Sequence, residues 1–193
     1  MPATGILLRR AQQDGRPAFD RLQRSMEPRL RRFITRLVGN GDRVRDIVQD
    51  TFLALYIKLE RIVSEEHLWP FVFRVARNLC YDELRRQNRF EIIAVSHGSE
   101  HSDDSFIPMA TGRRADDITH WVMAVSLVKN AVDRLPEAQR QTLILHFEEN
   151  LTYEQTAEAM GVDIGTVKSR IHHARKTLRD ILPEGFVRAL GFE

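Results

Sequence analysis

The apolar residues of this chain recur at helical spacing, and that spacing limits the fold more than any other feature. Over residues 18–38, 42–62 and 70–86 they return every three or four positions, which places them along one stripe of a helix that can face a core. No segment alternates convincingly between apolar and polar residues, as a half-buried strand does. We therefore predict an all-α protein with almost no sheet.

The predicted core of the N-terminal half consists of the three stripes on these helices. The first helix contributes Phe19, Leu22, Met26, Leu30, Phe33, Ile34 and Leu37. The second contributes Val44, Ile47, Val48, Thr51, Phe52, Leu55, Leu59 and Ile62. The third contributes Phe71, Val72, Val75, Ala76, Leu79 and Leu84. A turn at residues 39–41 separates the first two helices, and Pro70 suits the first turn of the third, where a backbone N–H has no partner within the helix.

Charge is distributed unevenly along the 193 residues, although the formal net charge is only +2. Residues 1–45 contain eleven arginines and four acidic residues, a net charge of +7. Residues 91–120 carry a net charge of −4 and lack a sustained apolar period, which is typical of a linker. We predict two small helical domains joined by a flexible acidic linker. The N-terminal domain covers residues 1–91, the linker 92–118 and the C-terminal domain 119–193.

The C-terminal domain contains a helix-turn-helix pattern. Helices at residues 121–135 and 137–150 are separated by Pro136, which cannot donate a hydrogen bond inside a helix. Thr152 and Gln155 have the spacing of a capping box, in which each side chain bonds the backbone N–H of the other residue at the start of a helix. A glycine that suits a left-handed turn then precedes the last long helix.

The last long helix has a basic face opposite its apolar stripe. The stripe consists of Ile164, Val167, Ile171, Ala174 and Leu178, and the outward side chains include Lys168, His172, Arg175, Lys176 and Arg179. Residues 163–180 carry a net charge of +3. Such a face can enter the DNA major groove, because arginine and lysine neutralise phosphates while polar side chains near the helix start reach base edges. A charge run alone is more often a solvated helix face, but the tight turn and the paired helices favour DNA binding.

The helix over residues 70–86 has a second face of cations, an amide and an aromatic. Its members are Arg74, Arg77, Asn78, Tyr81 and Arg85, and Arg86 and Arg89 extend the charge. This composition suits a nucleic-acid strand that has been opened, because the cations neutralise the backbone while unpaired bases stack or form hydrogen bonds. A solvated helix face is the alternative explanation.

Other features of the sequence exclude several classes of function. The single cysteine, Cys80, rules out an intrachain disulfide and lies near the apolar stripe, so we expect a small buried side chain. His97 and His101 lie in the polar linker without the rigid support that metal ligands need. We find no catalytic constellation and expect no enzyme activity, no cofactor and no metal. Because no apolar run reaches membrane-spanning length and no signal peptide is evident, we expect a cytoplasmic protein without membrane insertion.

Three segments together resemble bacterial RNA polymerase sigma factors of the extracytoplasmic-function group, within the sigma-70 family. They are DIVQDTFLALY at residues 46–56, FVFRVARNLCYDELRR at 71–86, and LPEAQRQTLILHFEENLTYEQTAEAMGVDIGTVKSRIHHARKTL at 135–178. The resemblance spans both predicted domains in the family's order, with a linker where the family has one. It implies a dissociable subunit that binds core RNA polymerase, through its clamp helices and flap, and directs initiation at chosen promoters.

The resemblance also implies roles for individual residues. Candidates for binding polymerase are Asp46, Gln49, Asp50 and Leu53. Candidates for melting and recognising the minus-10 promoter element are Arg74, Arg77, Asn78, Asp82, Arg85 and Arg86. Candidates for recognising the minus-35 element are Gly165, Thr166, Lys168, Ser169, His172, His173 and Arg175. The acidic linker is expected to thread toward the polymerase active site and RNA exit channel, and an anti-sigma factor is the further partner that the family implies.

The sequence departs from the family pattern at three places. Phe71 and Val72 stand where the family usually has Trp-Leu, and Trp69 lies two positions earlier. The segment at residues 64–67 is acidic, and we expect it to form a loop before the third helix. His172 and His173 stand where an arginine or an aromatic residue is frequent, and DNA contacts there would make affinity mildly dependent on pH.

Two alternatives come from other classes of protein. A conventional helix-turn-helix regulator would bind duplex DNA without being a polymerase subunit, but it leaves residues 46–56 and the basic face of residues 70–86 without a role. An enzyme or metal sensor built on a helical bundle would need a bound metal or a perturbed catalytic group.

Overall fold

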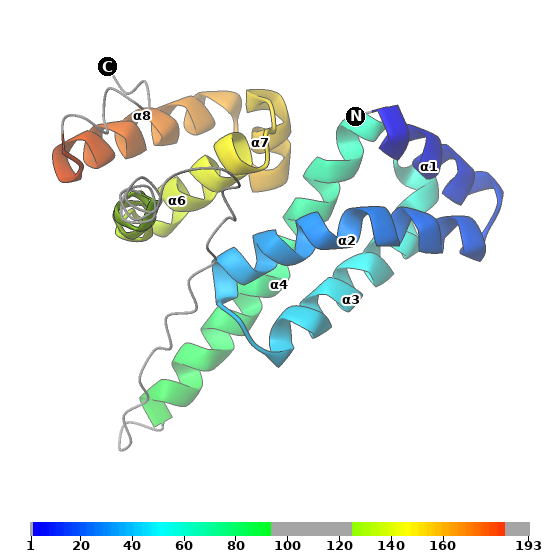
Figure 1. Ribbon diagram of the computed structural model, residues 1–193, viewed down its shortest axis with the longest axis horizontal. Helices are drawn as coiled ribbons and strands as arrows, with labels where there is room; N and C mark the ends of the chain where they lie inside the picture. The colour runs from blue at the N-terminus through cyan, green and yellow to red at the C-terminus, as the bar shows by residue number, and fades with distance from the viewer. Residues whose placement is uncertain (1, 94–124, 184–193) are drawn as a thin grey trace, which may run out of the picture. The chain divides into compact units, whose positions relative to one another are not determined.

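The computed structural model describes residues 2–93 and 125–183, and each regular element in these ranges is helical (Figure 1). This confirms the predicted all-α class. The described residues form two continuous ranges, one on each side of most of the predicted linker. We call residues 2–93 the N-terminal unit and residues 125–183 the C-terminal unit, and describe each by itself. The predicted linker lies outside the described residues except for its first two positions.

The N-terminal unit contains four α-helices and one short 3-10 helix. They are α1 (Pro2–Gln13), α2 (Arg16–Val38), α3 (Asp42–Lys58), η1 (Leu59–Arg61) and α4 (Glu65–Ile93). Helices α2, α3 and α4 pack against one another, and α1 lies along α2 (Figure 1). The unit is therefore a small bundle whose core lies among α2, α3 and α4.

Side chains from two of the predicted stripes are buried as expected. Each apolar position predicted on α2 is at most 6% exposed, and so is each position predicted from Val44 to Ile62. Thr51, the one polar member, donates a hydrogen bond from its hydroxyl to the Ile47 carbonyl at 2.7 Å, so its burial leaves no unpaired donor. Helical spacing therefore identified the buried side chains, although the second predicted helix ends earlier than residue 62: α3 stops at Lys58, Leu59 lies in η1 and Ile62 is extended.

The stripe predicted on α4 is only partly correct. Phe71, Val72 and Ala76 are buried, but the other three predicted positions, Val75, Leu79 and Leu84, are half-buried. Phe73, which the sequence analysis omitted, is fully buried. Its ring centroid lies 4.7 Å from that of Phe33 and 5.2 Å from that of Trp69, whose ring is also covered by the Arg29 guanidinium at 4.0 Å. Because α4 packs against both α2 and α3, its buried surface is wider than a single stripe.

Helix α4 also begins earlier than predicted. Residues 65–67, predicted as a loop, form its first turn, and Pro70 lies inside the helix instead of in the first turn. Pro70 is buried, so packing offsets the hydrogen bond that a proline cannot donate. The prediction placed the start at the proline because a proline is most easily tolerated there.

Helix α1 was not predicted, and its contacts explain why. Leu8 and Ala11 are buried, and the Gln12 side-chain amide donates hydrogen bonds to the carbonyls of Leu59 and Ile62, at 3.0 and 2.9 Å. A twelve-residue helix is marginal by itself in water, so α1 depends on packing against the rest of the unit.

The C-terminal unit contains the predicted helix-turn-helix. Residues 125–133 are helical, and α6 (Glu137–Leu143) continues through a π-helical turn, η2 (Ile144–Glu148). Helices α7 (Tyr153–Met160) and α8 (Ile164–Ile181) follow, and α8 packs against α6 (Figure 1). Among the described residues of both units, no helix combines the length and the apolar content that a membrane crossing requires.

The turn chemistry predicted for this unit is confirmed. The Thr152 backbone N–H donates to Gln155 Oε1 at 3.0 Å, and the Gln155 N–H donates to Thr152 Oγ1 at 3.2 Å. Gly161 has a φ of 66°, in the left-handed region that favours glycine. Both features depend on neighbouring residues alone, and this is why the sequence revealed them.

The stripe predicted on α8 is correct at four of its five positions. Val167, Ile171, Ala174 and Leu178 are buried, whereas Ile164 is exposed. Ile164 is the first residue of α8, and helical side chains lean toward the N-terminus. Its side chain therefore extends past the end of the helix.

Candidate functional site

The four candidate polymerase-binding residues share one face of α3. Asp46, Gln49, Asp50 and Leu53 are spaced at three and four residues along the helix, and all are exposed, with Leu53 at 58%. Ile57 continues the same face one turn later and is 71% exposed. The sequence analysis missed Ile57, although its spacing from Leu53 was visible. The α3 face is thus acidic at its start and apolar toward its end, as a surface that binds a basic and partly apolar partner would be.

Candidate minus-10 residues lie on two different faces of α4. Arg74, Arg77, Asn78 and Arg85 recur at three- and four-residue intervals and form the first face, which we call the α4 basic face. Asn78 and Arg85 are exposed, and Arg77 Nη2 donates to Asn78 Oδ1 at 3.1 Å. The Arg74 guanidinium lies 5.9 Å from the centroid of the Phe71 ring.

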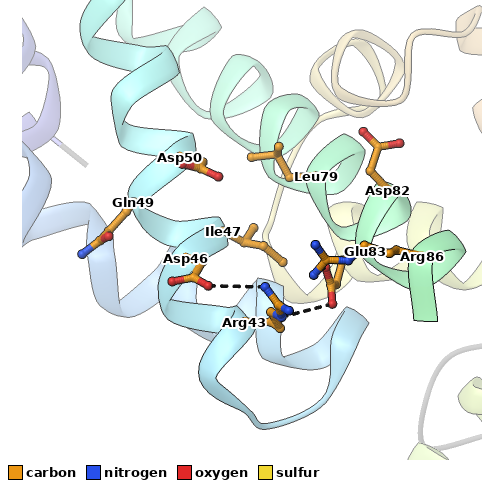
Figure 2. Close-up of a pocket in the computed structure, with 9 residues that line it drawn as sticks. All are labelled: Arg43, Asp46, Ile47, Gln49, Asp50, Leu79, Asp82, Glu83 and Arg86. Atoms are coloured by element: carbon orange, nitrogen blue, oxygen red, sulfur yellow. Dashed lines mark hydrogen bonds and ion pairs between the residues drawn. The ribbon is translucent and has the colours of Figure 1, made fainter. Parts of the chain in front are cut away.

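The second α4 face lines a groove shared with α3. The groove has a volume of about 430 Å³, with Ile47 and Leu79 as its apolar lining. Figure 2 shows its polar lining, which comes from both helices: Arg43, Asp46, Gln49, Asp50, Asp82, Glu83 and Arg86. The structure therefore brings two minus-10 candidates, Asp82 and Arg86, together with three polymerase-binding candidates.

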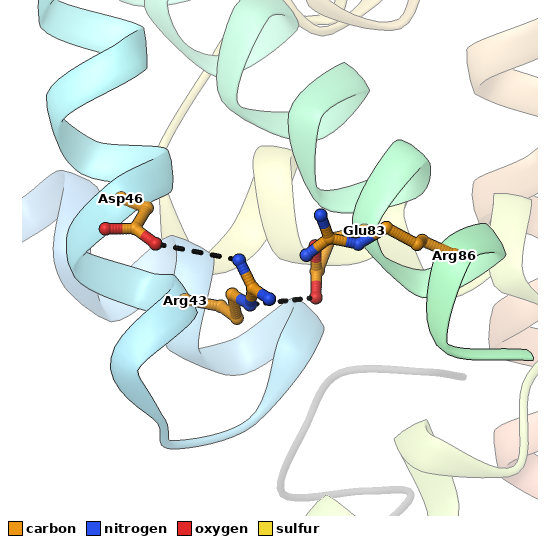
Figure 3. A network of polar contacts seen from close by, with 4 residues as sticks. All are labelled: Arg43, Asp46, Glu83 and Arg86. Carbon is orange, nitrogen blue, oxygen red and sulfur yellow. Dashed lines mark hydrogen bonds and ion pairs between the residues drawn. The ribbon is translucent and has the colours of Figure 1, made fainter. Parts of the chain in front are cut away.

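An ion-pair network crosses this groove (Figure 3). Arg86 Nη2 donates to Glu83 Oε2 at 2.6 Å, and Arg43 Nε lies 3.5 Å from Glu83 Oε1. Arg43 Nη1 lies 3.8 Å from Asp46 Oδ2. The sequence analysis singled out neither Arg43 nor Glu83. Their spacing of three residues from Asp46 and Arg86 hinted at pairs within each helix, but the pair between helices depends on the packing of α3 against α4.

The minus-35 candidates lie on α8, and most of them face outward. Gly165, Lys168, Ser169, His172 and His173 are exposed, whereas Thr166 and Arg175 are half-buried. His173 Nδ1 lies 2.7 Å from the Ser169 carbonyl oxygen. Because a carbonyl oxygen only accepts, Nδ1 carries the hydrogen in this contact.

Aromatic side chains from η2 and α7 support two of the α8 cations. Lys168 Nζ lies 5.8 Å from the centroid of the Tyr153 ring, and the Arg175 guanidinium lies 5.3 Å from that of Phe147. Arg175 is therefore turned toward η2, unlike the outward-facing candidates. Glu154 is also near Lys168: hydrogen bonds from its own backbone and from the Thr152 side chain lower its pKa, and the Lys168 charge adds to this effect.

Cys80 and the possible metal ligands were the remaining candidates for chemistry in the described ranges. Burial raises the pKa of the Cys80 thiol to about 12, so the group stays protonated at neutral pH. Within the described ranges, no group of three or more His, Cys, Asp or Glu residues is placed to hold a metal ion. His97 and His101 lie outside those ranges.

Comparisons with known proteins match both units to one family. The model for sigma-70 region 2 matches residues 22–90, which include α3 and the α4 basic face, and the model for sigma-70 region 4 matches residues 126–178, which include most of α8. The structure of the sigma factor RpoE in complex with the anti-sigma factor NepR, from Bartonella quintana, is similar at a TM-score of 0.64 and 27% identity, covering 84% of this chain and 95% of that one. CnrH in complex with the cytosolic domain of CnrY shares the fold, at a TM-score of 0.61 and 20% identity, covering 92% of this chain and 96% of that one.

Relatives by sequence agree with this match. The ECF RNA polymerase sigma factor EcfG of Rhodopseudomonas palustris is 31% identical over 155 residues, which cover 80% of each chain. The ECF RNA polymerase sigma factor SigE of Mycolicibacterium smegmatis is 31% identical over 170 residues, which cover 88% of this chain and 63% of that one. The chain therefore belongs to the extracytoplasmic-function group of sigma-70 family sigma factors.

Proposed function

We propose that this protein is an alternative sigma factor that binds core RNA polymerase and directs initiation at promoters with particular minus-10 and minus-35 elements. The observation that carries the proposal is the pairing, in one chain, of a region 2 match bearing the α3 face with a region 4 match bearing the exposed α8 face. In a conventional helix-turn-helix regulator, the region 2 match with its α3 face would have no role. The protein itself performs no chemistry and needs no cofactor, and it acts in the cytoplasm with the polymerase.

The N-terminal domain, residues 1–91, docks on the polymerase and handles the minus-10 element. Asp46 and Asp50 meet basic side chains of the clamp helices, and exposed Leu53 and Ile57 add apolar contact area. The α4 basic face binds the opened strand: its arginines neutralise phosphates, and Asn78 offers both a donor and an acceptor to an unpaired base.

The C-terminal domain, residues 119–193, recognises the minus-35 element. The exposed Lys168, Ser169 and His172 of α8 enter the major groove of the duplex. One small module buries only about 600–1,000 Å² on DNA, so neither domain is selective alone. Tethering both to polymerase raises the effective concentration of the second contact and makes the pair selective.

An anti-sigma factor is the proposed inhibitory partner. RpoE of Bartonella quintana, which is similar over 84% of this chain, is bound to the anti-sigma factor NepR. A partner of this kind would compete with core polymerase for this protein. If the protein purified from the native cell carried neither polymerase nor any inhibitor, the proposals of both partners would be contradicted.

Run-off transcription tests the proposed function directly. Purified core polymerase is incubated with genomic fragments, with or without the protein, and the RNA starts are mapped. We expect a defined set of new starts with shared upstream elements only when the protein is present. Core polymerase with the Asp50→Arg variant is the matched control. Starts that do not depend on the protein would refute the proposal.

A gel shift without polymerase distinguishes the sigma factor proposal from the main alternative, a conventional helix-turn-helix regulator. The sigma factor proposal requires core polymerase for a specific promoter complex. A specific complex of the purified protein alone with a palindromic duplex would instead identify a conventional regulator.

A further inference from the structure

Arg86 lies on a different face of α4 from the other arginines assigned to the promoter strand. Leu79, Asp82, Glu83 and Arg86 follow one another at helical spacing and line the groove with α3 (Figure 2). Arg85, on the α4 basic face, points more than a quarter of a helical turn away from Arg86, because each residue rotates the helix by about 100°. Position along the sequence therefore groups Arg86 with Arg85, whereas the helix separates them.

Glu83 binds the two arginines of the groove. Only 11% of its side-chain surface is exposed, whereas the side chains of Arg43 and Arg86 are 53% and 45% exposed. Its two carboxylate oxygens are divided between them, with Oε2 at 2.6 Å from Arg86 Nη2 and Oε1 at 3.5 Å from Arg43 Nε (Figure 3). A carboxylate this far removed from water needs such partners, because burial disfavours an unpaired charge.

The charges of this network cancel. Arg43 and Arg86 supply two positive charges, and Glu83 and Asp46 supply two negative ones, with Asp46 Oδ2 at 3.8 Å from Arg43 Nη1. A guanidinium whose charge is balanced in this way attracts a phosphate only weakly. The network also links the first turn of α3 to α4. It therefore connects the helix that carries the α3 face to the helix that carries the α4 basic face.

We propose that Glu83 is a positioning residue: it pairs with Arg43 of α3 across the groove, which braces α3 against α4, and it holds Arg86 on its own helix, so that Arg86 does not bind a phosphate of the promoter strand. This proposal rests on the proposed function and narrows its set of DNA-binding residues. It removes Arg86 from the set of DNA-binding residues. It also assigns Arg43 and Glu83 a separate role, which is to fix the angle between α3 and α4.

The salt dependence of strand binding tests the place of Arg86. The protein is assembled with core polymerase, and its binding to a single-stranded oligonucleotide carrying the mapped minus-10 element is measured over a series of salt concentrations. Removing one cation that neutralises a phosphate should flatten the slope of log K against log [salt] by about 0.7. We expect Arg74→Gln, on the α4 basic face, to flatten the slope by about that amount and Arg86→Gln to leave it unchanged. Equal flattening by both variants would overturn the proposal.

The role of Glu83 is tested by freeing Arg86. Glu83→Gln removes the carboxylate but keeps the length of the side chain, so we expect Arg86 to become available to the strand and to steepen the slope by up to about 0.7. The further change Arg86→Gln should abolish this gain. The matched control is Glu27→Gln, which makes the same change in net charge and breaks the pair of Glu27 with Arg31 on α2, at 2.9 Å. A slope unaltered by Glu83→Gln, or steepened equally by the control, would overturn the positioning role.

Failure of this inference is distinguishable from failure of the proposed function. If the unaltered protein gives core polymerase no affinity for the minus-10 strand, the proposed function fails. If strand binding is present and Arg86→Gln flattens its salt dependence, only the roles inferred for Glu83 and Arg86 are refuted. A change in melting temperature alone does not account for a change in salt slope, because the slope reports the number of ions released on binding.

Discussion

The N-terminal unit distributes its candidate surfaces over two helices, whereas the C-terminal unit concentrates its candidate surface on one. In the N-terminal unit the α3 face and the α4 basic face are positioned by contacts between residues far apart in sequence, such as Arg43 with Glu83. In the C-terminal unit the α8 face follows a capping box and a left-handed glycine, both set by neighbouring residues. The comparison teaches that two basic helix faces, one on α4 and one on α8, can depend on very different ranges of interaction.

The two units also differ in what their cores are made of. In the N-terminal unit, Phe33, Phe73 and Trp69 pack in one aromatic cluster between α2 and α4. In the C-terminal unit, the buried residues of α8 are aliphatic: Val167, Ile171, Ala174 and Leu178. Large buried aromatics contribute more free energy per residue, so single core substitutions should damage the N-terminal unit most.

The largest expected effect is the loss of stability caused by Phe73→Ala. Phe73 is fully buried against Phe33 and Trp69, and truncation of such a side chain costs about 3–5 kcal/mol in the free energy of unfolding. Urea unfolding followed by tryptophan fluorescence, with Trp121→Phe in the background so that Trp69 alone reports, measures this loss. If the two units differ as described, hydrogen exchange in α8 should change little. A loss below about 1 kcal/mol would show that the cluster is not central to the unit.

Asp50→Arg should have the next largest effect, on binding to core polymerase. Reversing a charge that pairs with a basic partner in a desolvated contact costs about 2–5 kcal/mol, enough to remove core polymerase from a pull-down. Asp14→Arg makes the same change in charge at an exposed position away from the α3 face and should leave the pull-down intact. Helicity by circular dichroism should be unchanged in both. Normal recovery of core polymerase with Asp50→Arg would place the docking surface elsewhere.

Lys168→Ala should have a smaller effect, confined to the C-terminal unit. If Lys168 contacts a base, promoter selection weakens by about 1–3 kcal/mol, and less if it meets phosphate alone. Transcription is compared on promoters with and without the upstream element, using core polymerase saturated with each variant. Binding to core polymerase should survive, in contrast to Asp50→Arg. Equal transcription from both promoters by the unaltered protein would contradict the assignment of α8.

Thr152→Ala should have the smallest effect, and it tests how local the support of α8 is. Loss of an N-cap hydroxyl costs about 1 kcal/mol of helix stability, because the Gln155 N–H loses its acceptor. Hydrogen exchange of the α7 amides measures the change, and exchange in α2 and α3 serves as the internal control. Thr177→Ala, also on a helix but with its hydroxyl bonded to the His173 carbonyl at 3.1 Å, should leave exchange in α7 unaltered. Unchanged exchange in Thr152→Ala would mean that packing, and not the cap, holds α7.

Prediction from sequence succeeded where structure depends on neighbours along the chain. The stripes of α2 and α3 were complete, and the capping box and the turn glycine were correct, because each needs only residues within about one or two helical turns. Exposure of the α3 face followed from the same period. The roles of the exposed residues came from resemblance to a family and stay predictions until the variants above are measured.

Prediction failed where one element responds to several others. The start of α4 and the burial of Phe73 depend on packing against α2 and α3, and α1 depends on Gln12 reaching the carbonyls of Leu59 and Ile62. No periodicity in a single segment contains that information. The same holds for Arg86, which lies beside Arg85 in sequence but lines the groove with α3.

The sequence by itself determined the all-α class, the apolar stripes of α2 and α3 and the chemistry of the helix-turn-helix, because each follows from interactions between residues a few positions apart. Only the tertiary structure decided which polar side chains share a surface. Glu83 meets Arg43 because α3 packs against α4, and that packing places residues forty positions apart within ion-pair distance, at 3.5 Å. The sequence determines which side chains are charged, but the fold determines which of them pair, since electrostatic attraction depends on distance in space.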